Sequence, residues 1–216
     1  GFTVAKETVA LMTEIVAAGE LPHLSTERIW VETETALGEQ HPEVYWQVLA
    51  DCGAVAVLLP ELAVSHGISA LSRAAPHTGR TDCRWAALLA DLPERRAQEA
   101  SERLKAPNAF SLLATRTSGG RSSIKAALKD ATECMALLKV LDGLRREEPF
   151  EGFCETLVAL EQKSVDAHSA VDLLRSARDA AQHVKAADFV DQGLTGPALG
   201  AAIQAKQIER IAKLLD

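Results

Sequence analysis

The stretch SGGRSSIK, Ser118 to Lys125, brings together groups that bind phosphate oxygens. It offers a flexible backbone, several hydroxyls and two cations, Arg121 and Lys125. Such residues clamp phosphate groups without reading bases. Arg116 lies close by in the sequence, so we predict that Arg116, Arg121 and Lys125 contact a phosphate polymer. The alternative is a solvated loop between two helices.

A second candidate anion site is the stretch QGLTGPALG near the end of the chain. Gly193 and Gly196 bracket a Leu-Thr pair, and Pro197 opens a helical pattern. Uncovered backbone N–H groups at a helix start attract anions, which makes Gly193 and Gly196 candidate phosphate contacts. The alternative is a plain helical hairpin. The G-x-x-G-P spacing resembles helix-hairpin-helix DNA-binding modules, but with one residue more between the glycines than they use.

The pair Arg145–Arg146 closes the apolar pattern LLKVLDGLRRE. Both side chains are candidate phosphate contacts, and both equally suit a helix C-terminus as partners of the helix dipole. The net charge of −7 is unevenly distributed. The range 95–146 holds 11 basic and 5 acidic residues, whereas 1–94 holds 5 and 13, and 147–216 holds 7 and 12. A basic middle is expected where one face meets a polyanion, and the alternative is a solvated helical surface.

Catalytic and metal-binding patterns are missing from the sequence. It contains no G-x-S-x-G elbow and no Walker loop, and its six histidines are dispersed. Ala90 stands beside Asp91 where a His-Asp metal pair could have been, so no metal site is predicted. The four cysteines form no C-x-x-C pair, which suits a reducing compartment, and no apolar run could span a bilayer. We expect a cytoplasmic protein with no catalytic residue, cofactor or membrane partner.

Composition and periodicity predict an all-α fold. The chain has 216 residues, is 47% hydrophobic and only 4% aromatic, so alanine and leucine should fill its interior. Apolar residues recur at helical spacing over most of the chain, and no segment alternates at period two for long. Two stretches interrupt this pattern. Residues 61–80 are predicted to form a loop or a ragged short helix, and residues 106–123 a short helix followed by a Ser/Gly/Arg loop.

Several blocks of the sequence resemble one family. HPEVYWQVLADCGAVAVLLPEL is similar to a signature of the bacterial class II tRNA nucleotidyltransferases, the CCA-adding enzymes and their poly(A) polymerase relatives. STERIWVETETAL resembles the neck helix before it, with the pattern E-R-I-x-x-E from Glu27 to Glu32. RWAALLADL resembles the HD segment of many members, and LLKVLDGLRREEPFEGF and QGLTGPALGAAIQAKQIERI resemble their body and tail. The resemblance covers nearly the whole chain.

This resemblance implies a multi-helix bundle with a neck at 1–62, a body at 63–146 that carries a degenerate HD-like segment, and a tail at 147–216. The family's helical region holds the acceptor arm and elbow of tRNA by shape and backbone. The nucleotidyl-transfer head, with its D-x-D motif and two Mg²⁺ ions, is not in this sequence and is expected in cis in a longer protein. Glu27 and Arg28 are expected to brace the floor of that head's active site.

The resemblance implies a tRNA-binding part of a CCA-adding enzyme and leaves other functions open. A poly(A) polymerase would use the same region for RNA, because residues of the absent head decide which nucleotides are added. A helical oligomerisation or scaffold domain would need the charges only for solvation. The alanine at position 90 also implies that the phosphohydrolase activity of the HD segment is absent.

Overall fold

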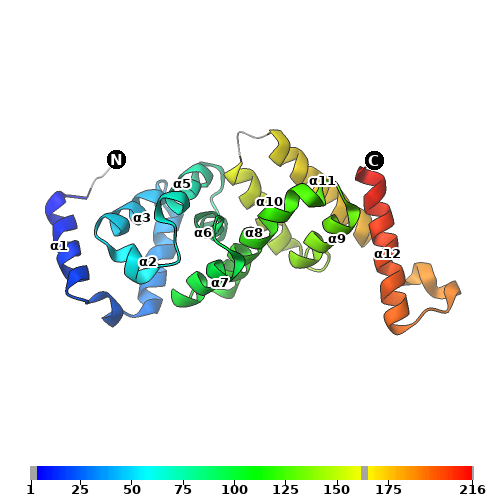
Figure 1. The fold of residues 1–216 in the computed structure, drawn as a ribbon, viewed down its shortest axis with the longest axis horizontal. Helices are drawn as coiled ribbons and strands as arrows, with labels where there is room; N and C mark the ends of the chain where they lie inside the picture. The colour runs from blue at the N-terminus through cyan, green and yellow to red at the C-terminus, as the bar shows by residue number, and fades with distance from the viewer. Residues whose placement is uncertain (1–3, 162–164, 216) are drawn as a thin grey trace. The chain divides into compact units, whose positions relative to one another are not determined.

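The computed structural model describes residues 4–161 and 165–215, and all regular structure in these residues is helical (Figure 1). The all-α prediction is confirmed. In chain order the helices are α1 (Lys6–Ala17), η1 (Leu21–His23), α2 (Thr26–Gly38), α3 (Pro42–Asp51), α4 (Ala54–Leu58), α5 (Val64–Ala74), η2 (Ala75–His77), α6 (Thr81–Leu89), α7 (Glu94–Arg103), α8 (Asn108–Ala127), α9 (Ala131–Val140), α10 (Glu147–Leu160), α11 (Val165–Gln182), η3 (Ala186–Gln192) and α12 (Gly196–Leu215).

The chain divides into two compact units, residues 1–119 and 120–216, and the boundary falls inside α8. Each unit has its own core. The division into a neck, a body and a tail stays a prediction.

Helix α6 is the centre of the first unit. Every residue from Cys83 to Leu89 is buried, and α6 packs against α5 and α2. Several of the chain's few aromatic residues meet at this helix, which carries Trp85. The ring centre of Trp30 lies 5.2 Å from that of Trp85 and 5.0 Å from that of Phe110, both edge to face, and Trp46 lies 6.1 Å from Trp85. This core therefore uses indole rings as well as the predicted alanine and leucine.

The stretch at 61–80 forms a regular helix, α5, followed by the short helix η2. The prediction of a loop or a ragged helix underestimated the regularity of this stretch. Ser65, Gly67 and Ser69 have low helix propensity, but packing against α6 outweighs it. Gly67 is part of that packing. A Cβ at this position would lie 2.8 Å from the carbonyl oxygen of Leu88 and 2.5 Å from Cδ1 of Leu62.

We expect Gly67→Ala to lower the free energy of unfolding by about 1–2 kcal/mol. Because both approaches are closer than 3.0 Å, the cost of overpacking should lie in the upper part of the usual range of about 1–3 kcal/mol, and the roughly 1 kcal/mol that alanine gains in helix propensity offsets only part of it. Gly200→Ala in α12 is the matched control, because nothing lies within 4 Å of its added Cβ. The control should be as stable as the wild type or more stable. Urea unfolding of both variants measures the difference, and equal stabilities would contradict the close approach of α5 and α6.

The predicted Ser/Gly/Arg loop is wrong, because α8 runs without a break from Asn108 to Ala127 through SGGRSS. Close packing explains why two glycines are tolerated inside this helix. A Cβ at Gly120 would lie 3.0 Å from the ring of Phe153 and 3.2 Å from Leu137, within the second unit. A Cβ at Gly119 would lie 2.9 Å from the carboxylate of Glu94 in the first unit. The absence of a Cβ at these two glycines thus allows side chains from other helices to pack close to the backbone of α8.

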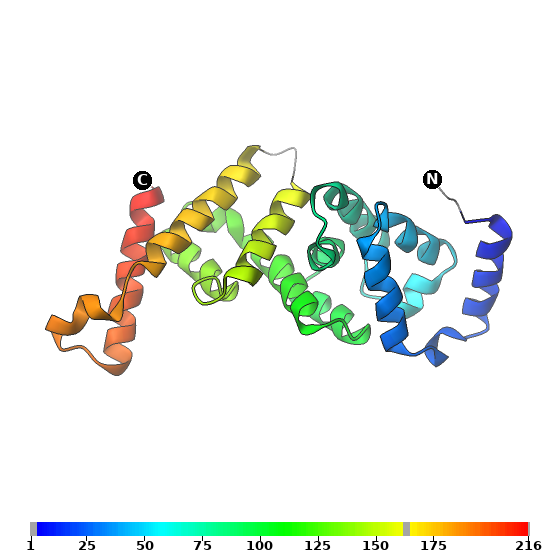
Figure 2. The ribbon, with the colours of Figure 1, turned by 180° about the vertical axis from the view of Figure 1, so that it is seen from behind.

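Helix α12 closes the second unit by packing on α11 and α9 (Figures 1 and 2). The core of this unit includes the fully buried residues Phe150, Phe153, Leu138 and Leu174. No helix in the described part of the chain is long and apolar enough to cross a lipid bilayer.

Candidate RNA-binding surface

The end of α8 carries two of the predicted phosphate contacts on one side. Arg121 and Lys125 are four residues apart, so they lie on the same face of the helix. Both line one hollow of the second unit. Nη2 of Arg121 donates to Oε1 of Glu161 at 2.5 Å, whereas Lys125 is exposed and pairs with no carboxylate of the described residues. Arg116 is half-buried and belongs to the first unit, five residues earlier on α8.

Arg145 and Arg146 do not end a helix, contrary to the prediction. Helix α9 stops at Val140, and Arg146 is instead the residue that precedes α10. The turn between the helices places Asp142 at a φ of 54°, and Arg146 lies 3.6 Å from its carboxylate. A helix dipole at a C-terminus therefore does not explain these cations. Both side chains are exposed.

Helix α11 holds this turn in place. Nε of Arg178 donates to the carbonyl of Gly143 at 2.6 Å, and Nε2 of Gln182 donates to the carbonyl of Leu144 at 3.1 Å. The guanidinium of Arg178 also lies 5.2 Å from the ring centre of Phe150. The backbone that carries Arg145 is thus fixed by side chains from a neighbouring helix.

The structure separates the two cation pairs of the second unit. Arg146 occupies the N-cap position of α10, and Glu161, the partner of Arg121, occupies its C-cap position. A helix of 14 residues spans about 20 Å, so the pairs lie near opposite ends of α10. The segment between η3 and α12 lies apart from the end of α10 in both views (Figures 1 and 2).

Gly193 and Gly196 form the predicted turn before α12. Their φ angles are +62° and +56°, in the left-handed region that favours glycine. Both are exposed, and nothing lies within 4 Å of a Cβ built on either residue. Their role as phosphate contacts stays a prediction.

Most cations of the basic segment 95–146 have a carboxylate partner. Ion pairs engage six of the eleven: Arg95, Arg96, Arg103, Lys105, Arg121 and Arg146. Four others are exposed and form no ion pair with the described residues: Lys125, Lys129, Lys139 and Arg145. All four lie in the second unit, and Lys139 instead donates to Oε1 of Gln204 at 2.7 Å. Sequence reasoning missed Lys129, although the four-residue spacing from Arg121 through Lys125 was a signal for it.

Glu27 and Arg28 lie in the first turn of α2, which Ser25 caps by accepting a hydrogen bond from the Arg28 N–H at 3.4 Å. The Glu27 carboxylate is held by Nζ of Lys105 at 2.5 Å and by the Ser25 hydroxyl at 3.0 Å. The Lys105 hydrogen bond is the main reason that the pKa of Glu27 falls to about 2. Glu27 thus links the start of α2 to the turn that follows α7 within the first unit. Its predicted contact with a catalytic head stays a prediction.

We expect the Glu27–Lys105 pair to stabilise the first unit only above acidic pH. The pKa of Glu27 is lower in the folded chain than its ordinary value of 4.5, so its contribution is complete above about pH 4.5 and is lost as the pH falls toward 2. Urea unfolding of the wild type and of Lys105→Met, from pH 6 to pH 2, measures this. The gap in stability between the two should close below pH 4.5 and shrink with salt. A gap that stays constant down to pH 2 would contradict it.

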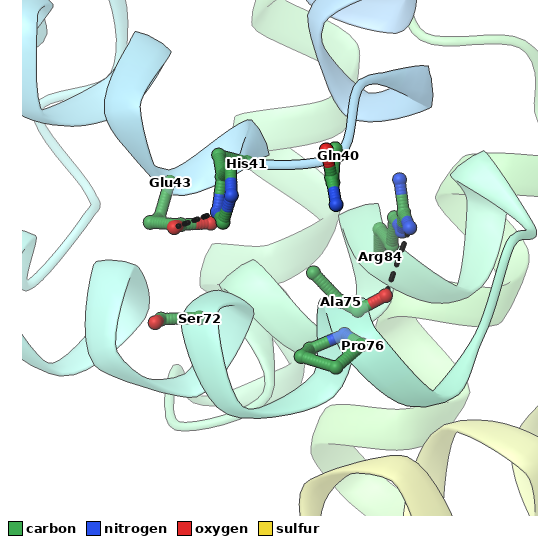
Figure 3. Close-up of a pocket in the computed structure, with 7 residues that line it drawn as sticks. All are labelled: Gln40, His41, Glu43, Ser72, Ala75, Pro76 and Arg84. Atoms are coloured by element: carbon green, nitrogen blue, oxygen red, sulfur yellow. Dashed lines mark hydrogen bonds and ion pairs between the residues drawn. The ribbon is translucent and has the colours of Figure 1, made fainter. Parts of the chain in front are cut away.

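A hollow of about 500 Å³ in the first unit is lined in part by His41, Glu43 and Arg84 (Figure 3). Nδ1 of His41 lies 3.2 Å from Oε1 of Glu43. The guanidinium of Arg84, which is only 7% exposed, donates to four backbone carbonyls at 2.6–2.8 Å, those of Leu37, Glu39, Ala75 and Thr78. Its N–H groups therefore donate to the protein's own backbone. The role of this cation is to connect segments of the first unit and not to bind an anion.

Residues 84–92, in which the sequence resembles an HD segment, begin on α6 and run past its end. Ala90, the C-cap residue of α6, is buried, and the neighbouring Asp91 is exposed. Within residues 4–161 and 165–215, no three His, Cys, Asp or Glu side chains come close enough to hold a metal ion.

Known proteins resemble the chain over nearly its full length. Residues 1–65 match a family model described as "Probable RNA and SrmB-binding site of polymerase A". A CCA-adding enzyme of Pseudomonas putida is 38% identical over 213 residues, and a multifunctional CCA protein of another strain of this species is 40% identical over 216. A CCA-adding enzyme of Marinobacter nauticus is 34% identical over 226 residues.

The matches cover 98–100% of this chain but only 58–59% of these relatives, so the chain spans less than two thirds of their length. No solved structure matches it. By sequence, the chain therefore resembles a C-terminal region of the CCA-adding enzymes over nearly its own full length.

Proposed function

We propose that this chain is the tRNA-binding part of a CCA-adding tRNA nucleotidyltransferase. It would hold the acceptor arm and elbow of tRNA while a catalytic head in cis adds nucleotides to the 3′ end. The observation that carries the proposal is the 38–40% identity to CCA proteins over 98% of the chain. The head, its Mg²⁺ ions and the nucleotide chemistry would belong to the part of the relatives that this chain does not span. Such an enzyme would work in the cytoplasm.

Charge favours the second unit as the part that meets RNA. The segment 1–65, which matches the RNA-binding family model, holds two basic and ten acidic residues. A polyanion is repelled by such a surface, because phosphate contacts gain their free energy from cations and released counterions. The exposed cations Lys125, Lys129 and Arg145 all lie beyond residue 119. We therefore assign phosphate binding to the second unit, including the end of α8.

Protein binding by the segment 1–65 is a second candidate function. The segment is acidic, and several apolar side chains on it are exposed, among them Leu11 at 57%, Leu24 at 54% and Val31 at 58%. The matching family model is described by a protein partner as well as by RNA. A poly(A) polymerase remains an alternative parent, because only its head would differ.

Binding titrations with two nucleic acids test the proposal. Folded tRNA and duplex DNA with the same number of phosphates are titrated with the 216-residue chain between 50 and 200 mM salt. We expect tRNA to bind more tightly than DNA at each salt concentration, with an affinity that falls as salt rises. Equal binding of both would indicate a general polyanion binder. No binding of either would indicate a scaffold and overturn the proposal.

A further inference from the structure

A hollow of about 500 Å³ lies in the second unit, between the end of α8, the end of α10 and the start of α11. Its floor is apolar. Ile124, Leu157, Ala167 and Ala170 each expose less than 9% of their surface. Two of these four side chains are methyl groups, which leaves room above them. The volume of the hollow lies in the range of sites that bind small organic groups.

The rim of the hollow is polar and carries a net positive charge. Arg121 is held by Glu161 at 2.5 Å and exposes only 25% of its side chain, so the ion pair restrains the guanidinium where it lines the hollow. Lys125 is exposed and pairs with no carboxylate of the described chain. The rim therefore offers a fixed planar cation, a carboxylate that can accept N–H groups and an unpaired cation.

These three groups match the parts of a nucleotide. A base presents an apolar face, which stacks on apolar surfaces and on guanidinium planes, and an edge with N–H donors. Its phosphate is an anion that suits a lysine as a point charge. A purely apolar ligand would leave Lys125 without a partner, and an acidic peptide would offer no flat group for the floor.

We propose that this hollow receives one unpaired nucleotide of the bound RNA, with the base over the apolar floor and the phosphate at Lys125. The inference rests on the proposed RNA-binding function and adds to it a contact that depends on the RNA's shape. RNA-binding proteins commonly take up unstacked bases from loops and ends, which a regular duplex cannot offer. The hollow would therefore help to distinguish folded tRNA from a plain duplex.

Filling the hollow tests the base contact. Ala170→Leu projects an isobutyl group from the floor and changes no charge. We expect it to weaken tRNA binding about tenfold, since stacking one base contributes about 1–3 kcal/mol, and to leave the salt dependence unchanged. Binding of a fully paired RNA duplex should not change. Ala167→Leu is the second variant, in case the first one disturbs packing on α10.

Two lysines provide a matched test of the phosphate contact. Lys125 lines the hollow, whereas Lys129, four residues further on, does not; both are exposed. Lys125→Gln should weaken tRNA binding several-fold more than Lys129→Gln, although each variant removes one charge. Equal losses would contradict the phosphate contact, because Lys125 would then contribute only to the overall electrostatic potential of the protein.

An abasic scan of the unpaired tRNA nucleotides identifies the occupant. Removal of one base should weaken binding to the wild type about tenfold and should have little effect on Ala170→Leu. The nucleotide subsite is overturned, while the proposed function stands, if the chain binds tRNA but no abasic substitution and neither filled-hollow variant changes the affinity. If the wild type binds no tRNA, the proposed function fails and this inference fails with it. Loss of affinity in Ala170→Leu without any abasic effect would also overturn the subsite, because the hollow would then hold something other than a base.

Discussion

Replacing Arg84 by methionine should lower the free energy of unfolding by about 4 kcal/mol. The variant keeps an apolar stem but leaves four backbone carbonyls without their donor, including those of Leu37 and Glu39 at the end of α2. Each unsatisfied buried acceptor costs about 1–3 kcal/mol, and partial relaxation reduces the sum. The cation at the C-terminus of α2 would be lost as well.

Two control variants separate this effect from a general loss of charge. Arg95→Met removes an arginine whose side chain is 89% exposed and should change stability by less than about 0.5 kcal/mol. Arg84→Lys keeps the charge but lacks the planar fork, so it should restore only a small part of the loss. Denaturant unfolding followed by circular dichroism measures all three. If Arg84→Met is within 1 kcal/mol of the wild type, Arg84 does not join these segments as described.

Charge reversal on α8 should have the largest effect on RNA binding. We expect the triple variant with Arg116, Arg121 and Lys125 each replaced by Glu to bind tRNA about a hundredfold more weakly near 100 mM salt, with a shallower salt dependence. The reason is that lost phosphate contacts also lose their counterion release, and the new carboxylates repel the polyanion. Binding isotherms at several salt concentrations measure both quantities.

Because Arg121→Glu would also face Glu161, this variant could lose affinity through local unfolding. A second triple variant avoids that: Lys125, Lys129 and Arg145 form no ion pair with the described residues, and their reversal to Glu should leave helicity unchanged. Its affinity for tRNA should fall by a similar factor. Reversal of Lys6 and Arg28 on the first unit is the control and should have a much smaller effect. Unchanged affinity in both triple variants would refute the placement of the RNA-binding surface.

Helix periodicity was sufficient to predict the all-α fold, but two local predictions failed for a common reason. Gly67 in α5 and the glycines of SGGRSS in α8 lower helix propensity, and from the sequence alone they indicate a break. In the structure, Gly67 and Gly120 lie where another helix approaches, so the missing Cβ permits packing that more than offsets the lost propensity. That gain depends on neighbours that are distant in sequence.

The candidate site was predicted in part. The i, i+4 spacing of Arg121 and Lys125 requires only a helix to bring them together, whereas the pairing of Arg121 with Glu161 requires knowledge of how α8 and α10 meet. The sequence contains no signal for the role of Arg84. Its acceptors are backbone carbonyls up to 47 residues away, and a residue of any type has such a carbonyl. Pairing with carboxylates, which also decides how many of the 11 basic residues of the segment 95–146 are free to meet an anion, likewise requires the fold.

Cross-linking from single introduced cysteines tests most directly whether the second unit meets RNA. The four natural cysteines are free and buried, and burial raises the pKa of Cys134 to about 11 and is the main cause that raises the pKa of Cys154 to about 12, so a maleimide photo-cross-linker should react selectively with an exposed thiol. Lys129→Cys places the linker beside the end of α8, and Lys6→Cys places it on α1 of the acidic first unit. Our account predicts that tRNA is captured from position 129 and hardly at all from position 6. Capture from position 6 alone, with tRNA binding intact in both variants, would contradict it.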